Sequence, residues 1–110
     1  MRVAHTYSRH TREAAQLLGL EIARARRMHH WTAASLSERA GISRMTLHKI
    51  ENGDPTVGLG IAFEVATLVG VPLFGVAGEE LASLTDRSAD RLALLPARIR
   101  EPEHEVHDDF

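Results

Sequence analysis

The sequence has no cysteine and no long apolar run, and both absences restrict what the chain can be. Without cysteine there is no disulfide framework, no thiolate zinc site and no cysteine nucleophile. No apolar stretch approaches the ~18 residues of a membrane-spanning helix, and the polar N-terminus lacks the apolar core of a signal peptide. We therefore expect a soluble, cytoplasmic protein with no part in a membrane.

Motifs of the common enzyme classes are also missing. The sequence contains no glycine-rich phosphate loop, no nucleophile elbow and no kinase motif. His104 and His107 stand among acidic residues and have the side chains of a zinc site, but they lie in a tail too polar to hold a rigid geometry. His29 and His30 lack the His-Glu-x-x-His spacing of metalloproteases. We expect no catalytic activity, no metal and no cofactor.

The two halves of the chain differ in charge. Its 110 residues, 44% of them apolar, suit one domain with a modest core, and the net charge is −2. Residues 1–57 hold nine basic and five acidic residues, whereas residues 58–110 hold four basic and ten acidic ones. This asymmetry fits contact between the first half and a polyanion, and it equally fits ordinary surface variation.

Hydrophobic residues recur at helical spacing along most of the chain, and no segment alternates as a half-buried strand does. Thr32 and Ser43 are suited to cap two short helices, and Gly41 is suited to the positive φ that ends the first of them. Trp31 precedes the first cap and is expected in the core rather than against a base. We therefore predict an all-α fold with helices over residues 12–29, 33–40, 44–51, 57–69 and 79–84, the last extendable through residue 95.

The third of these helices has two distinct faces. With Leu47 and Ile50 directed into the core, a rotation of about 100° per residue turns the remaining side chains away from it. The short helix before it and the turn at Gly41 complete the arrangement of a helix-turn-helix, which favours binding of the outward face to DNA over a merely solvated polar face. The outward side chains are Arg44, Met45, His48, Lys49 and Asn52.

The segment from Leu36 to Gly53 reads Leu-Ser-Glu-Arg-Ala-Gly-Ile-Ser-Arg-Met-Thr-Leu-His-Lys-Ile-Glu-Asn-Gly. It resembles the Cro/XRE-type helix-turn-helix domain of bacterial and phage repressors, and the resemblance covers residues 17–74. It implies a five-helix Cro/repressor-like fold that binds double-stranded DNA. We expect a homodimer on a palindromic operator, because a single module makes few base contacts.

The resemblance also implies roles for individual residues. Arg26 and Glu51 correspond to a structural ion pair between the first and third helices. Ala33 stands where the family often has Gln, so one customary DNA contact is missing here. The remaining positions are Arg44, Met45, His48 and Lys49 for base contacts, and Thr32, Ser43 and Asn52 for phosphate contacts.

The C-terminal end of the sequence favours a more specific class of regulator. The run Leu95-Pro96-Ala97-Arg98-Ile99-Arg100 and the acidic end Asp108-Asp109-Phe110 resemble the end of HipB-like antitoxins. That resemblance implies a HipA-like kinase toxin as partner and repression of the shared operon. The alternative is a stand-alone phage-type or metabolic repressor with no toxin partner. The expected divisions are a flexible arm over 1–11, a DNA-binding domain over 12–76, a helical dimerisation extension over 77–95 and an acidic tail over 96–110.

Overall fold

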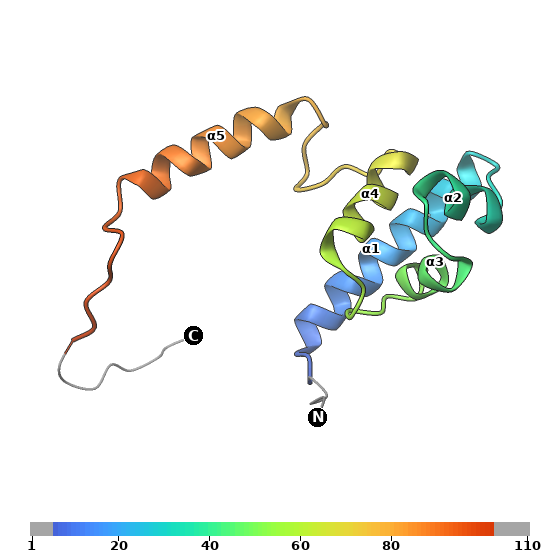
Figure 1. Cartoon of the computed structure of the whole chain (residues 1–110), viewed down its shortest axis with the longest axis horizontal. Coiled ribbons are helices and arrows are strands. Elements are labelled where there is room, and N and C mark those ends of the chain that lie inside the picture. The colour runs from blue at the N-terminus through green and yellow to red at the C-terminus, as the bar shows by residue number, and fades with distance from the viewer. Residues whose placement is uncertain (1–5, 103–110) are drawn as a thin grey trace. The chain divides into compact units, whose positions relative to one another are not determined.

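The computed structural model describes residues 6–102, and these form five α-helices (Figure 1). No strand occurs among the described residues, in which one isolated antiparallel bridge joins Leu73 and Val76. The all-α fold predicted from the sequence is therefore confirmed. The helices are α1 (Arg9–Met28), α2 (Ala33–Ala40), α3 (Arg44–Glu51), α4 (Leu59–Val69) and α5 (Glu80–Ala93).

Two compact units make up the chain, which divides after Gly78, two residues beyond the expected end of the DNA-binding domain. The first unit contains α1 to α4 and the second contains α5. Among the described residues, no helix is both long enough and apolar enough to cross a membrane.

The first helix begins three residues earlier than the sequence predicts. The hydroxyl of Ser8 accepts a hydrogen bond from the Thr11 amide and thereby caps α1. Across the first turn of the helix, Arg9 Nε lies 2.9 Å from Glu13 Oε1. The expectation of a flexible arm through residue 11 is therefore wrong for residues 9–11, because this cap and this pair stabilise the first helical turn. Residues 1–5 lie outside the described residues.

The two short helices form as predicted, with the predicted caps. Thr32 Oγ1 accepts from the Ser35 amide at 3.0 Å, and Ser43 Oγ accepts from the Thr46 amide at 3.0 Å. Gly41 ends α2 with φ of 69°, a left-handed conformation that costs glycine little. Three residues thus separate α2 from α3, which fixes the angle between them.

The core lies where α1, α2, α3 and α4 meet. Its buried side chains come from all four helices, and the Ser37 hydroxyl buried beside them donates to the Ala33 carbonyl oxygen at 2.8 Å. α3 contacts both α1 and α2, so its position is set by packing on two sides. The buried hydrophobic residues are Ile22, Leu36, Leu47, Ile50, Val65, Ala66 and Val69.

The last two helices follow the prediction to different degrees. α4 begins at Leu59 rather than at residue 57, because Asp54 Oδ1 accepts from both the amide and the hydroxyl of Thr56 and holds a turn there. α5 ends at Ala93, within the extension through residue 95 that the sequence allows. Residues 96–102 contain no helix or strand, and the rest of the expected acidic tail, residues 103–110, lies outside the described residues.

Candidate nucleic-acid interface

α3 presents one face to solvent and one to the core. Leu47 and Ile50 are 1% and 4% exposed, whereas Met45 is 62% exposed. The other predicted base-contacting residues, Arg44, His48 and Lys49, are exposed as well. The structure thus brings all four onto the outer side of one short helix. A guanidinium, an ammonium, an imidazole and a thioether there offer hydrogen-bond donors and an apolar contact to a groove.

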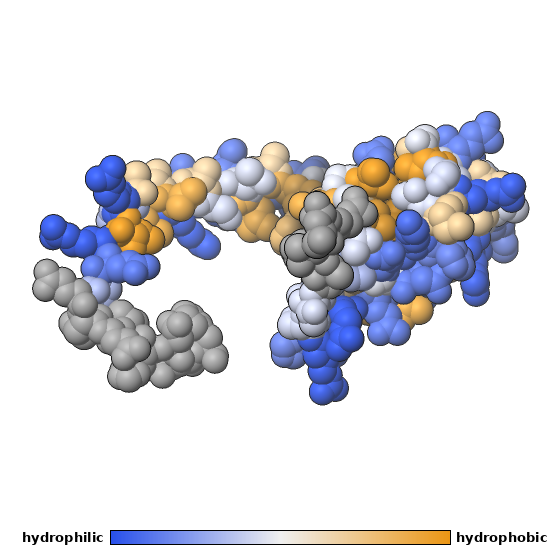
Figure 2. Space-filling view, turned by 60° about the horizontal axis from the view of Figure 1, so that its bottom comes forward, coloured by the Kyte–Doolittle hydropathy of each residue, from blue (hydrophilic) through white to orange (hydrophobic). Residues whose placement is uncertain are grey.

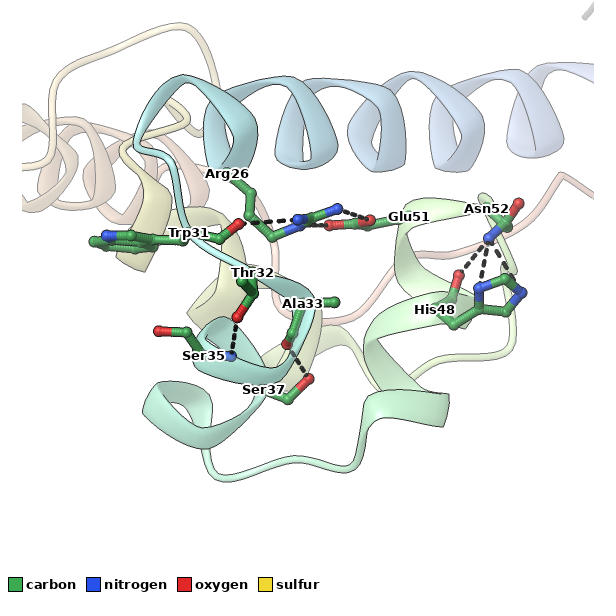
Figure 3. Close-up of polar contacts among 9 residues, drawn as sticks. All are labelled: Arg26, Trp31, Thr32, Ala33, Ser35, Ser37, His48, Glu51 and Asn52. Carbon is green, nitrogen blue, oxygen red and sulfur yellow. Dashed lines mark hydrogen bonds and ion pairs between the residues drawn. The ribbon is translucent and has the colours of Figure 1, made fainter.

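Arg26 and Glu51 fasten the end of α3 to the end of α1 (Figure 3). The guanidinium donates from Nε to Glu51 Oε2 at 2.7 Å and from Nη2 to Oε1 at 3.1 Å. Its Nη1 donates to the carbonyl oxygen of Trp31 at 3.0 Å. This one side chain therefore joins three segments, which are α1, the turn that precedes α2, and α3. The hydrogen bonds to Glu51 raise the pKa of Arg26 above its ordinary value, which keeps the guanidinium charged although only 12% of it is exposed.

Two glycines let α3 approach α1 this closely. A methyl group on Gly19 would lie 2.8 Å from the carbonyl oxygen of Glu51 and still nearer to that of Ile50. Gly53, just after α3, has φ of 76°, and a methyl group there would lie 2.7 Å from the Cα of Gln16. Backbone therefore packs against backbone at the C-terminal end of α3, which limits how far the helix can tilt.

The three residues predicted to contact phosphates are exposed, but their side chains already have partners. Thr32 and Ser43 serve as the helix caps described above. Asn52 Nδ2 donates to the carbonyl oxygen of His48 at 2.7 Å and lies 3.3 Å from its Nδ1 (Figure 3). All three thus mark helix ends, where free backbone amides of α2 and α3 and the Asn52 amide group lie at the surface.

A groove that the sequence reasoning missed lies beside the end of α3. Arg24 and Arg27, three residues apart on α1, line it together with Asn52. Both arginines are exposed. The sequence shows two arginines at helical spacing, but their position next to α3 follows only from the packing of α1 against α3. These cations extend the positive charge of α3 onto its neighbour.

Trp31 lies at the edge of the core and is partly buried. The ring of His29 stacks on it with centroids 4.8 Å apart, and the guanidinium carbon of Arg39 lies 4.3 Å from its centroid. His29 also places Nε2 3.0 Å from the carbonyl oxygen of Val69 at the end of α4. Trp31 therefore holds the junction between α1, α2 and α4, in keeping with the expected core role.

Among the described residues, no group of three His, Cys, Asp or Glu side chains is placed to hold a metal ion. The tail histidines considered for zinc, His104 and His107, lie outside the described residues, as does Phe110.

Comparison with known proteins gives one match. A family model described as helix-turn-helix matches residues 22–76, which is half of the chain and includes α2, α3 and α4 entirely. The comparison with curated proteins found no match, and neither did the comparison with solved structures.

Proposed function

Because the chain belongs to the helix-turn-helix family and is a DNA-binding transcription regulator of the XRE type, we propose that it represses transcription as a homodimer. In this proposal α3 lies in the major groove of a palindromic operator, and the protein acts in the cytoplasm at the nucleoid. The chain carries no catalytic activity in this account.

The observation that carries the proposal is the exposed, cationic outer face of α3 on a helix fixed by Arg26 and Glu51. Arg44 and Lys49 are suited to donate to guanine O6 and N7, and Met45 is suited to contact a thymine methyl group. His48 completes the base-contacting set. Because α3 is held rigidly, a side chain on it that faces the wrong base cannot shift to reach another hydrogen-bond partner. This rigidity favours discrimination between bases.

In this proposal, residues at the ends of the helices make the contacts with DNA phosphates. Thr32, Ser43 and Asn52 lie where free amides and short polar side chains reach the surface. Arg24 and Arg27 add two cations beside Asn52. Since Thr32 accepts a hydrogen bond in its cap, its hydroxyl hydrogen and the nearby amides are groups offered to phosphate oxygens. The Ser43 hydroxyl also shares a hydrogen bond of 3.0 Å with the Thr46 hydroxyl.

A second part of the proposal concerns a protein partner. The likeness of the C-terminal segment to HipB-like antitoxins supports a role as the antitoxin of a HipA-like kinase toxin, with repression of the shared operon. Ile99 in that segment is 83% exposed and is available to a partner. The alternative, a stand-alone regulator, predicts no such partner. Copurification with the protein encoded beside it distinguishes the two, and a chain truncated at Leu95 that still neutralises the toxin would exclude the tail from this role.

The test of the DNA-binding proposal is a footprint of the purified protein on the DNA upstream of its own gene. We expect two protected half-sites whose centres lie about 34 Å apart, or a multiple of that, on one side of the duplex. Affinity should fall steeply as salt is raised, because bound cations release counterions from the phosphates. Absence of any protected site at low salt would contradict the proposal.

A further inference from the structure

α5 carries a stripe of leucines on a helix that has no buried residue. At about 100° per residue, Leu81, Leu84, Ser88, Leu92 and Leu95 fall within ~80° of one another around the helix. Leu95 follows the helix, but its amide donates to the Leu92 carbonyl oxygen at 3.0 Å, which continues the turn. Leu92 and Leu95 are 69% and 64% exposed, whereas Leu81 and Leu84 are partly buried. Figure 2 shows hydrophobic side chains at the surface of this segment.

The spacing within this stripe is symmetric. Counting outwards from Ser88, the leucines stand four and seven residues away in both directions. A two-fold axis through Ser88 would therefore place Leu81 against Leu95 and Leu84 against Leu92 of an antiparallel second copy. An interface between two identical chains around a two-fold axis requires such self-complementarity, because each residue pair must occur twice.

We propose that α5 pairs with α5 of a second copy, antiparallel, with the two Ser88 residues facing each other at the two-fold axis. This inference rests on the proposed homodimer and names the surface that forms it. The small serine at the centre lets the two helices approach closely, while the leucines on either side exclude water from the contact.

The charged side chains of α5 lie at the edge of the stripe or away from it. Asp90 lies on the opposite side of the helix, about 160° from the centre of the stripe, and Asp86 lies beside it. Arg87 is held on the polar side, because its Nη1 donates to the hydroxyl of Ser83 at 3.1 Å. The charged residue nearest the stripe is Arg91, about 60° from its centre and therefore at its edge, where a long side chain can keep its guanidinium in water while two helices pair.

Single cysteines test the pairing and its direction, since the natural chain has none. With a short bifunctional thiol reagent, Ser88→Cys should cross-link two full-length chains, whereas Asp90→Cys, on the polar side, should not. Leu81→Cys alone should also fail, because in the antiparallel pair the two copies of residue 81 lie about 21 Å apart along the helix. A mixture of Leu81→Cys and Leu95→Cys chains should cross-link. Self-linking of Leu81→Cys indicates a parallel pair, and no linking of Ser88→Cys indicates no pairing; each overturns the proposal.

A second variant avoids any dependence on the reagent. Ser88→Asp places two carboxylates together at the axis, so the dimer dissociation constant at pH 7 should rise by at least about tenfold. Ser88→Ala, the matched control, should leave it unchanged or lower it. Sedimentation equilibrium measures both constants, and an unchanged constant for Ser88→Asp would overturn the proposal.

The readouts separate this inference from the proposed function, because neither requires DNA. If the cross-links form as expected but no promoter DNA is protected, the α5 pairing is supported and the DNA-binding proposal is contradicted. If promoter DNA is protected but the cross-links do not follow the expected pattern, the α5 pairing is contradicted and the DNA-binding proposal is supported.

Discussion

Arg26 and Glu51, twenty-five residues apart in the sequence, meet through two hydrogen bonds of 2.7 and 3.1 Å at the C-terminal end of α3. Because the same guanidinium also donates to the Trp31 carbonyl oxygen, the pair links three segments of the chain at once. The outer face of α3 therefore depends on an ion pair that does not itself reach that face.

Removing one member of this pair should destabilise the fold. Glu51→Ala leaves the Arg26 charge nearly buried without its partner, so we expect the free energy of unfolding to fall by about 3 kcal/mol. Urea unfolding followed by circular dichroism measures it. The matched control is Glu13→Ala, which breaks the exposed Arg9–Glu13 pair of similar length and should cost only ~0.5 kcal/mol. Equal losses in the two variants would show that the buried pair has no special role.

The close contact between α1 and α3 gives a second prediction. In Gly19→Ala the new methyl group meets the carbonyl oxygens of Ile50 and Glu51, so the helices must move apart at a cost of about 1–3 kcal/mol. Gly60→Ala makes the same change at an exposed helical position in α4 with open space around it, and should stabilise by up to ~1 kcal/mol. Thermal unfolding of both variants checks the sign. A stabilising Gly19→Ala would contradict the packing described here.

The turn before α4 gives a prediction about pH. Hydrogen bonds from the hydroxyl and the amide of Thr56 hold the pKa of Asp54 below its ordinary value. A lowered folded-state pKa means that Asp54 stabilises the fold above about pH 4 and loses this contribution as the pH falls through the folded-state value. Asp54→Asn should therefore show a smaller loss of stability on acidification than the natural chain.

The measurement for Asp54 is urea unfolding at a series of pH values between neutral and strongly acidic. Thr56→Val keeps the carboxylate and removes only the hydroxyl donor, so it should lose part of the same pH dependence. Identical pH profiles for the natural chain and Asp54→Asn would show that this carboxylate is not coupled to folding.

Local signals in the sequence were sufficient for the centre of the fold. The caps at Thr32 and Ser43 and the left-handed Gly41 each depend on side chains within three residues, so α2 and α3 could be predicted to their ends. α1 and α4 begin at other residues than the hydrophobic pattern predicts, because Ser8 and the Asp54–Thr56 turn each act through one or two hydrogen bonds that leave this pattern unchanged.

In the candidate site too, local features could be predicted from the sequence and long-range contacts could not. Periodicity within α3 was sufficient to place Arg44, Met45, His48 and Lys49 on one exposed face, whereas their roles towards DNA stay predictions. The groove at Arg24 and Arg27 could not be predicted, because it arises from a contact between helices distant in sequence. Contacts between helices that are distant in sequence produce no regular residue spacing from which they could be predicted.

The most direct test of the account is the affinity of Arg44→Ala for the operator, measured by fluorescence anisotropy against the natural chain. Loss of a bidentate guanine contact should cost about 1–3 kcal/mol and relax the preference at one base pair of each half-site. Arg87→Ala, which removes an exposed arginine from α5, should bind as the natural chain does. Unchanged affinity and unchanged base preference in Arg44→Ala would contradict the claim that the outer face of α3 reads DNA.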